Sequence, residues 1–121
     1  MPPARAPNGG LAGTSWELVS LDGNTQVGAA IGGQAVTLMF SSDTEAGGSG
    51  GCNGFGGNYQ ANATTGSISF SELVSTLIAC EEPIMSVEIA YFEALNAAQS
   101  YSISGTQLTI SGGGTSVFER Q

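Results

Sequence analysis

The sequence contains no histidine and no lysine, and two arginines are its only basic residues among 121. Histidine is the side chain that most often moves protons near neutral pH, and lysine is the usual amine nucleophile. Without both, acid–base catalysis would depend on carboxylates, tyrosines or a cysteine. We therefore expect a protein that is not an enzyme and has no catalytic residues.

Positive charge is scarce as well, because ten acidic residues against two arginines give a net charge of −8. Such a chain repels nucleic-acid phosphates and anionic membrane surfaces. Its acidity is best interpreted as a solubility feature of a monomer. We expect no nucleic-acid partner.

Long apolar runs are also missing. No stretch approaches the roughly 18 apolar residues that cross a bilayer, and the start, MPPARAPNGG, lacks the apolar centre of a signal peptide. The sequence thus predicts a protein that does not span a membrane. We expect residues 1–12 to be a flexible leader rich in proline and glycine, and residues 13–121 to form one domain.

Short segments rich in β-branched and aromatic residues predict β-strands. They cover residues 14–21, 35–40, 55–61, 67–70, 100–104, 107–111 and 115–120, with 71–80 as a further extended segment. Residues 26–34 are expected to form a loop or a weak edge segment, and residues 41–48 a polar turn.

One amphipathic helix is predicted over residues 81–99. Its apolar stripe, at about 100° per residue, contains Ile84, Val87, Tyr91, Ala94 and Leu95. The order of about five strands, one helix and three strands is typical of an α+β fold. We predict a curled antiparallel β-sheet of about eight short strands, partly barrel-like, packed on one α-helix.

The chain has two cysteines, Cys52 and Cys80, and neither belongs to a CxxC or histidine-containing pattern. We therefore expect no metal site and no cofactor. A disulfide between them would close a loop of about 29 residues, which the chain-entropy estimate values at about 3.5 kcal/mol. Two buried thiols or one reactive thiolate are the alternatives. Glu81 and Glu82 beside Cys80 would oppose a thiolate, and we favour the disulfide.

Cys52 lies in a glycine-rich stretch, GSGGCNGFGGNYQ, at residues 48–60. A phosphate-binding P-loop would need a lysine, which the chain lacks. We interpret the stretch as a tight turn or bulge that brings Cys52 to Cys80. Its turn residues are Gly51, Asn53, Gly54, Gly56 and Gly57. Asn53 suits a left-handed conformation or hydrogen bonds to nearby backbone.

Glu88 falls inside the apolar arc of the predicted helix, between Leu95 and Phe92 on the helical wheel. A buried carboxylate must be paired, hydrogen-bonded or protonated. We expect Glu88 to accept hydrogen bonds from backbone amides and so hold the sheet to the helix. A polar anchor in a ligand cavity, or exposure at the helix edge, are the alternatives.

Several stretches in order resemble the META/HslJ-like domain family, also called DUF306. They include LAGTSWELVSLDG, GGCNGFGGNYQ, LVSTLIAC and PIMSVEIAYFEAL, and the likeness runs from about Leu11 to Phe118. Its most specific parts are GCN-x-x-x-G-x-Y at 51–59 and T-x-x-A-C at 76–80, and Glu88 matches an acidic position of the family pattern.

The resemblance implies a small exported α+β domain, periplasmic or lipid-anchored in the cell envelope and linked to bacterial stress. It implies no established reaction. An exported protein of this kind would carry its signal outside these residues. We expect a module that binds an envelope protein or surface component. The alternative is a small-molecule or acyl-chain carrier with a cavity between sheet and helix.

Overall fold

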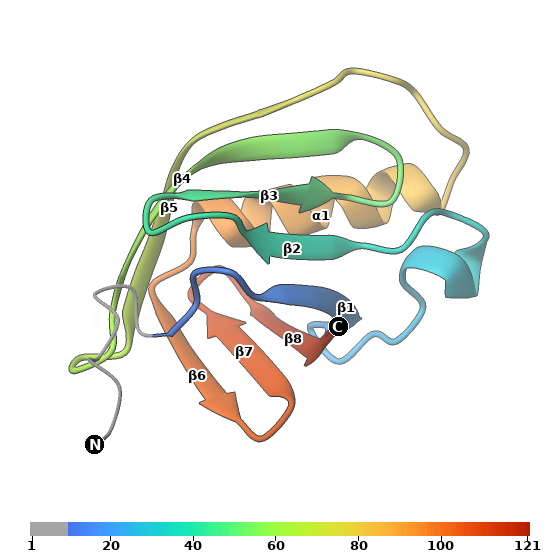
Figure 1. Ribbon diagram of the computed structural model, residues 1–121. Coiled ribbons are helices and arrows are strands. Elements are labelled where there is room, and N and C mark those ends of the chain that lie inside the picture. Colours follow the sequence, from blue (N-terminus) through green and yellow to red (C-terminus); the bar gives the residue numbers. More distant parts are fainter. Residues whose placement is uncertain (1–9) are drawn as a thin grey trace.

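The computed structural model describes residues 10–121 and shows eight strands and one α-helix (Figure 1). In chain order these are β1 (Ser15–Leu21), β2 (Thr37–Phe40), β3 (Glu45–Ser49), β4 (Gly54–Asn62), β5 (Ser67–Ser75), α1 (Ile84–Asn96), β6 (Ser100–Ser104), β7 (Gln107–Ser111) and β8 (Thr115–Arg120). A single 3-10 turn covers Gly28–Ile31 within the expected loop. Five strands, a helix and three strands confirm the predicted α+β order.

Each strand pairs antiparallel with the next, and β1 also pairs with β8, so the sheet closes into a barrel. The closure is uneven. β4 and β5 pair over most of their length, whereas β5 and β6 share only the pair Ser67 and Ser100. The partly barrel-like, curled sheet predicted from the sequence is confirmed, with β5–β6 as its thinnest seam.

The helix α1 lies behind β2 and β3 in Figure 1 and contacts β5 and β8. Tyr91 and Leu95 from its apolar stripe are fully buried. The Tyr91 ring meets Phe118 and Phe55 edge-on, with ring centroids 6.1 and 5.8 Å apart. Its hydroxyl donates a hydrogen bond to the carbonyl of Thr37 in β2, 3.0 Å away. One helical side chain therefore joins α1 to three separate parts of the barrel.

The core reaches further toward the N-terminus than the expected boundary at residue 13. Leu11 is fully buried, and its carbonyl accepts a hydrogen bond from the Thr14 hydroxyl, which itself accepts one from the indole of Trp16. The leader prediction is thus wrong for Leu11, because its side chain fills the space beside Trp16 and the other buried apolar residues. Residues 1–9 of that predicted leader lie outside the described part of the chain.

Two local predictions are wrong. Residues 45–48 of the expected turn lie in strand β3, because their backbone pairs with β2 and β4 on both sides. The helix begins at Ile84 and ends at Asn96, since Gln99 already pairs through its backbone with Ser111 and Ile68. In β1 a bulge between Leu18 and Ser20 turns Leu21 inward.

Candidate functional site

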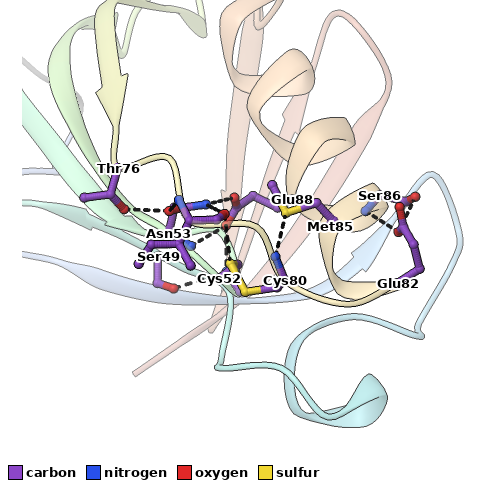
Figure 2. Close-up of a disulfide and its surroundings, with 11 residues drawn as sticks. Ser49, Cys52, Asn53, Thr76, Cys80, Glu82, Met85, Ser86 and Glu88 are labelled. Atoms are coloured by element: carbon purple, nitrogen blue, oxygen red, sulfur yellow. Dashed lines mark hydrogen bonds between the residues drawn. A yellow bond between two sulfur atoms is a disulfide. The ribbon is translucent and has the colours of Figure 1, made fainter.

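A disulfide joins Cys52, in the loop between β3 and β4, to Cys80, which precedes α1. The two Cα atoms are 6.2 Å apart, within the range usual for disulfides. Of the three states open from the sequence, the structure has the cross-linked one. Figure 2 shows the bridge between the Cys52 loop and the segment that leads into the helix.

Glu88 lies directly behind this bridge and is 1% exposed. Its Oε2 accepts hydrogen bonds from the backbone amides of Cys52 and Asn53, at 2.9 and 2.5 Å. Its Oε1 accepts one from the Asn53 side-chain amide at 2.6 Å (Figure 2). Three donors satisfy a carboxylate that would otherwise be costly to bury. This is the arrangement in which Glu88 holds the sheet to the helix.

Asn53 is the second centre of the network and is also 1% exposed. Besides Glu88, its side-chain amide donates to the carbonyl of Ile78 at 2.9 Å. Its Oδ1 accepts from the Thr76 hydroxyl and the Ile78 amide, both at 2.7 Å. All four hydrogen-bonding positions of the side chain are therefore used. We name Asn53, Glu88 and the Cys52–Cys80 disulfide the loop lock.

The expected turn occupies residues 50–53, where two glycines are required. Gly51 has φ +107°, a conformation unfavourable for other residues, and a Cβ on Gly50 would lie 2.6 Å from the Glu88 Cγ. Asn53 has no positive φ, so its role is hydrogen bonding and not left-handed backbone. Gly54, Gly56 and Gly57 lie in β4 and not in the turn, because their backbone pairs with the neighbouring strands. The strand has a bulge between Gly56 and Asn58, so the expected bulge is present at Gly57.

Two hollows adjoin the lock. The larger one, about 950 Å³, covers the outer face of β2–β5. The smaller one, about 250 Å³, lies between α1 and the segment of residues 75–79. Ser75 and Thr76 line both, so the two hollows adjoin at the end of β5. Sequence reasoning missed this surface, because its strand residues become neighbours only through pairing. The signal in the sequence was the pair of large apolar residues inside the T-x-x-A-C motif, Leu77 and Ile78, which the structure shows to be exposed.

Two ionisable groups on or beside α1 have shifted pKa values. Hydrogen bonds from the hydroxyl and amide of Ser86 lower the pKa of Glu82, which is exposed at the start of α1. Burial raises the pKa of Tyr91 well above that of a free tyrosine. Within residues 10–121, no group of three or more His, Cys, Asp or Glu side chains gathers to hold a metal ion. The arrangement is suited to rigid presentation of a surface.

The fold and its lock define a small α+β barrel domain stapled by one disulfide. The chain belongs to the META domain family, whose model matches residues 9–121. The family predicted from the sequence is thereby confirmed. In the part of the chain that the structure describes, no helix has the length and apolar content to cross a membrane.

Solved structures share this fold. An NMR structure of a protein from Burkholderia xenovorans is 29% identical with a TM-score of 0.73, and the match covers 100% of this chain and 90% of that one. A second NMR structure is 21% identical with a TM-score of 0.72, covering 90% of each chain. A DUF4847 family protein from Bacteroides vulgatus is 16% identical with a TM-score of 0.63, covering 90% of this chain and 93% of its own. No curated protein matches the sequence.

Proposed function

We propose that this chain is a non-enzymatic binding domain that is exported or held at the cell envelope, where it contributes to stress tolerance by binding another protein or surface component. The resemblance to HslJ-like domains suggests the link with stress. The disulfide supports export, because such bonds persist mainly in oxidising compartments. The binding role rests on the segment that the lock holds.

The observation that carries the proposal is a rigidly held segment with solvent-facing apolar side chains. Residues 76–80 are fixed at Thr76 and Ile78 by Asn53, and at Cys80 by the disulfide. Within this segment the side chain of Leu77 is 94% exposed and that of Ile78 is 59% exposed. Exposed apolar side chains on a well-held loop are typical of surfaces that bind a partner.

The carrier alternative requires an apolar cavity between the sheet and α1. That space is filled by Tyr91, Leu95 and Phe118, all fully buried. A hollow of about 50 Å³ remains beside Phe55 and Phe92, and the hollow between α1 and residues 75–79 has about 250 Å³. Both are smaller than typical ligand pockets of about 300–1,000 Å³. This filling favours the binding module over the carrier.

A capture experiment tests the proposal. The oxidised protein is immobilised and exposed to an envelope extract, beside the double variant Leu77→Ser/Ile78→Ser and a reduced sample. We expect a component that the oxidised protein retains and the double variant loses, and that binds the purified protein with an affinity at least about tenfold higher than the variant. Equal melting temperatures of the two proteins are the control. Retention of the same components by both would contradict the proposal.

A further inference from the structure

One row of outward-facing residues crosses four strands on the face next to the lock. Backbone pairing places Met39 of β2 opposite Gly47 of β3, Gly47 opposite Gly56 of β4, and Gly56 opposite Val74 of β5. Directly paired residues lie on the same face of a sheet. Met39 and Val74 are 45% and 71% exposed. Two apolar side chains thus flank a floor of two glycines, about 14 Å apart at three strand spacings.

We name this feature the glycine-floored groove; it is the hollow of about 950 Å³. The two glycines of its floor differ. A Cβ on Gly47 would lie 2.7 Å from the carbonyl oxygen of Phe55, so the fold itself requires glycine there. At Gly56 and the nearby Gly54 an added Cβ would meet no atom nearer than 3.8 Å, and neither has a positive φ. Larger side chains would fit the backbone at both positions and would pack β-strands better than glycine. Their absence leaves room above the sheet.

Apolar side chains concentrate at this groove. Six large hydrophobic residues are exposed in the described part of the chain. Two of them, Met39 and Val74, line the groove, and two more, Leu77 and Ile78, line the hollow that adjoins it. The other two, Ile89 on α1 and Ile103 on β6, line neither. Scattered exposed residues need no explanation, but a groove and an adjoining hollow that together gather four of the six are typical of a docking surface.

The negative charge around the groove indicates the charge of the partner that would bind there. Glu45 is its one ionisable lining residue, and no basic side chain within residues 10–121 lines it. Two further carboxylates lie close to the groove. Glu17 is the strand partner of the lining residue Thr37. Glu72 accepts a hydrogen bond from Asn58, the strand partner of Glu45. With a net charge of −8, a second copy of this chain and an anionic lipid surface are both repelled. A cationic partner is attracted.

We propose that the glycine-floored groove is the docking site for a segment of a partner protein that carries apolar and basic side chains together. Apolar side chains of the segment lie on the glycines between Met39 and Val74, and its lysines or arginines face Glu45 at the rim. This inference rests on the proposed function and names the chemistry of the partner that the binding domain takes.

Peptide titration followed by NMR tests the chemistry directly. The probe is a short synthetic peptide of leucine, lysine and serine, with two matched versions in which glutamate replaces lysine or serine replaces leucine. We expect the leucine–lysine peptide to shift the amide signals of Gly47, Gly54, Gly56 and Val74, and neither matched version to do so. Added salt should weaken the binding, because exposed charges contribute to it.

Variants of the protein give a second readout. Gly56→Val should fill the floor and Met39→Ser should remove one wall, and each should weaken the affinity for the leucine–lysine peptide by about tenfold without lowering the melting temperature substantially. Ile103→Ser is the matched control for Met39→Ser, since it removes an exposed aliphatic side chain elsewhere. Glu45→Lys should also weaken binding, whereas Glu93→Lys on the exposed side of α1 changes the net charge equally and should not.

Several results would overturn the inference. One is that the peptide shifts amide signals only of residues outside the groove, and another is that the glutamate version binds equally well. The others are that the protein dimerises through the groove, or that vesicles of phosphatidylglycerol shift the amide signals of groove residues. A component captured from the envelope whose affinity is unchanged by Gly56→Val but reduced by Leu77→Ser/Ile78→Ser would also overturn it, while the proposed binding function would stand. If the oxidised protein bound neither the leucine–lysine peptide nor any envelope component, both the inference and the proposed binding function would be contradicted.

Discussion

Asn53 and Glu88 are 35 positions apart in the chain and share two hydrogen bonds, from the backbone amide and the side-chain amide of Asn53 to the two carboxylate oxygens. Both residues are 1% exposed. The pair connects the β3–β4 loop to α1, and Asn53 extends the connection to Thr76 and Ile78. The disulfide therefore joins two of these three segments covalently, the loop and residues 76–80, and the polar pair connects both to α1 through charge-assisted hydrogen bonds.

Replacing Glu88 by glutamine should destabilise the fold. The glutamine amide would place donors against donors, because the Glu88 oxygens now accept from Cys52 and Asn53. We expect the free energy of unfolding to fall by about 2–4 kcal/mol, measured by urea denaturation of the oxidised protein. Glu93→Gln, an exposed change on the same helix, is the control and should have little effect. An unchanged midpoint for Glu88→Gln would show that the pair is not stabilising.

Removing the disulfide should lower the free energy of unfolding by about 3.5 kcal/mol, because the unfolded chain regains the freedom that the cross-link between two cysteines 28 positions apart removes. The double variant Cys52→Ser/Cys80→Ser should show this loss at neutral pH in thermal and urea unfolding. Adding a reductant should destabilise the native protein to a similar extent and leave the variant unaffected. Equal stability of the native protein with and without reductant would contradict the expectation.

Close approach of the loop to α1 predicts opposite outcomes for two neighbouring glycines. A Cβ at Gly50 would lie 2.6 Å from Cγ of Glu88 and 2.8 Å from Cζ of Phe92, so Gly50→Ala should cost about 1–3 kcal/mol. At Gly54 the nearest atom would be 3.8 Å away, and Gly54→Ala should leave stability unchanged or slightly higher. Thermal unfolding of the two variants under the same conditions compares them. A larger loss at Gly54 than at Gly50 would be inconsistent with this geometry.

Burial of Tyr91 predicts a loss of stability at high pH. The pKa of Tyr91 is raised well above 10.0 in the folded protein, while an unfolded tyrosine ionises near pH 10. The folded state therefore binds the proton more tightly, so its contribution is complete below about pH 10 and is lost as pH rises further. The chain has no lysine and its cysteines are cross-linked, so tyrosines dominate titration in this range.

The measurement is the melting temperature between neutral pH and about pH 11. Tyr91→Phe should lose about 1 kcal/mol at neutral pH, because the Thr37 carbonyl loses its donor, and its stability should then fall less steeply above pH 10 than that of the native protein. Parallel curves for the two proteins would show that another group causes the alkaline loss.

Several features of the fold were predictable because they depend on local periodicity. Alternation marked β1 and the C-terminal strands β6–β8, and a stripe with the period of a helix marked α1. The position of Glu88 within that stripe indicated a buried carboxylate. Family resemblance, carried by the motifs around Cys52 and Cys80, indicated the domain as a whole. The small, polar residues of β3 have no such pattern, and pairing on both sides makes them a strand.

By itself, the sequence determined the acidic character, the absence of histidine and lysine, the order of elements and the presence of two cysteines. Tertiary structure decided that the sheet closes through β1 and β8, that Asn53 saturates its hydrogen bonds on Glu88, Thr76 and Ile78, and that Met39 and Val74 stand on either side of bare glycines. The reason is that periodicity is encoded over a few neighbouring residues. Strand register and burial of a polar pair depend on contacts between segments that are distant in the chain.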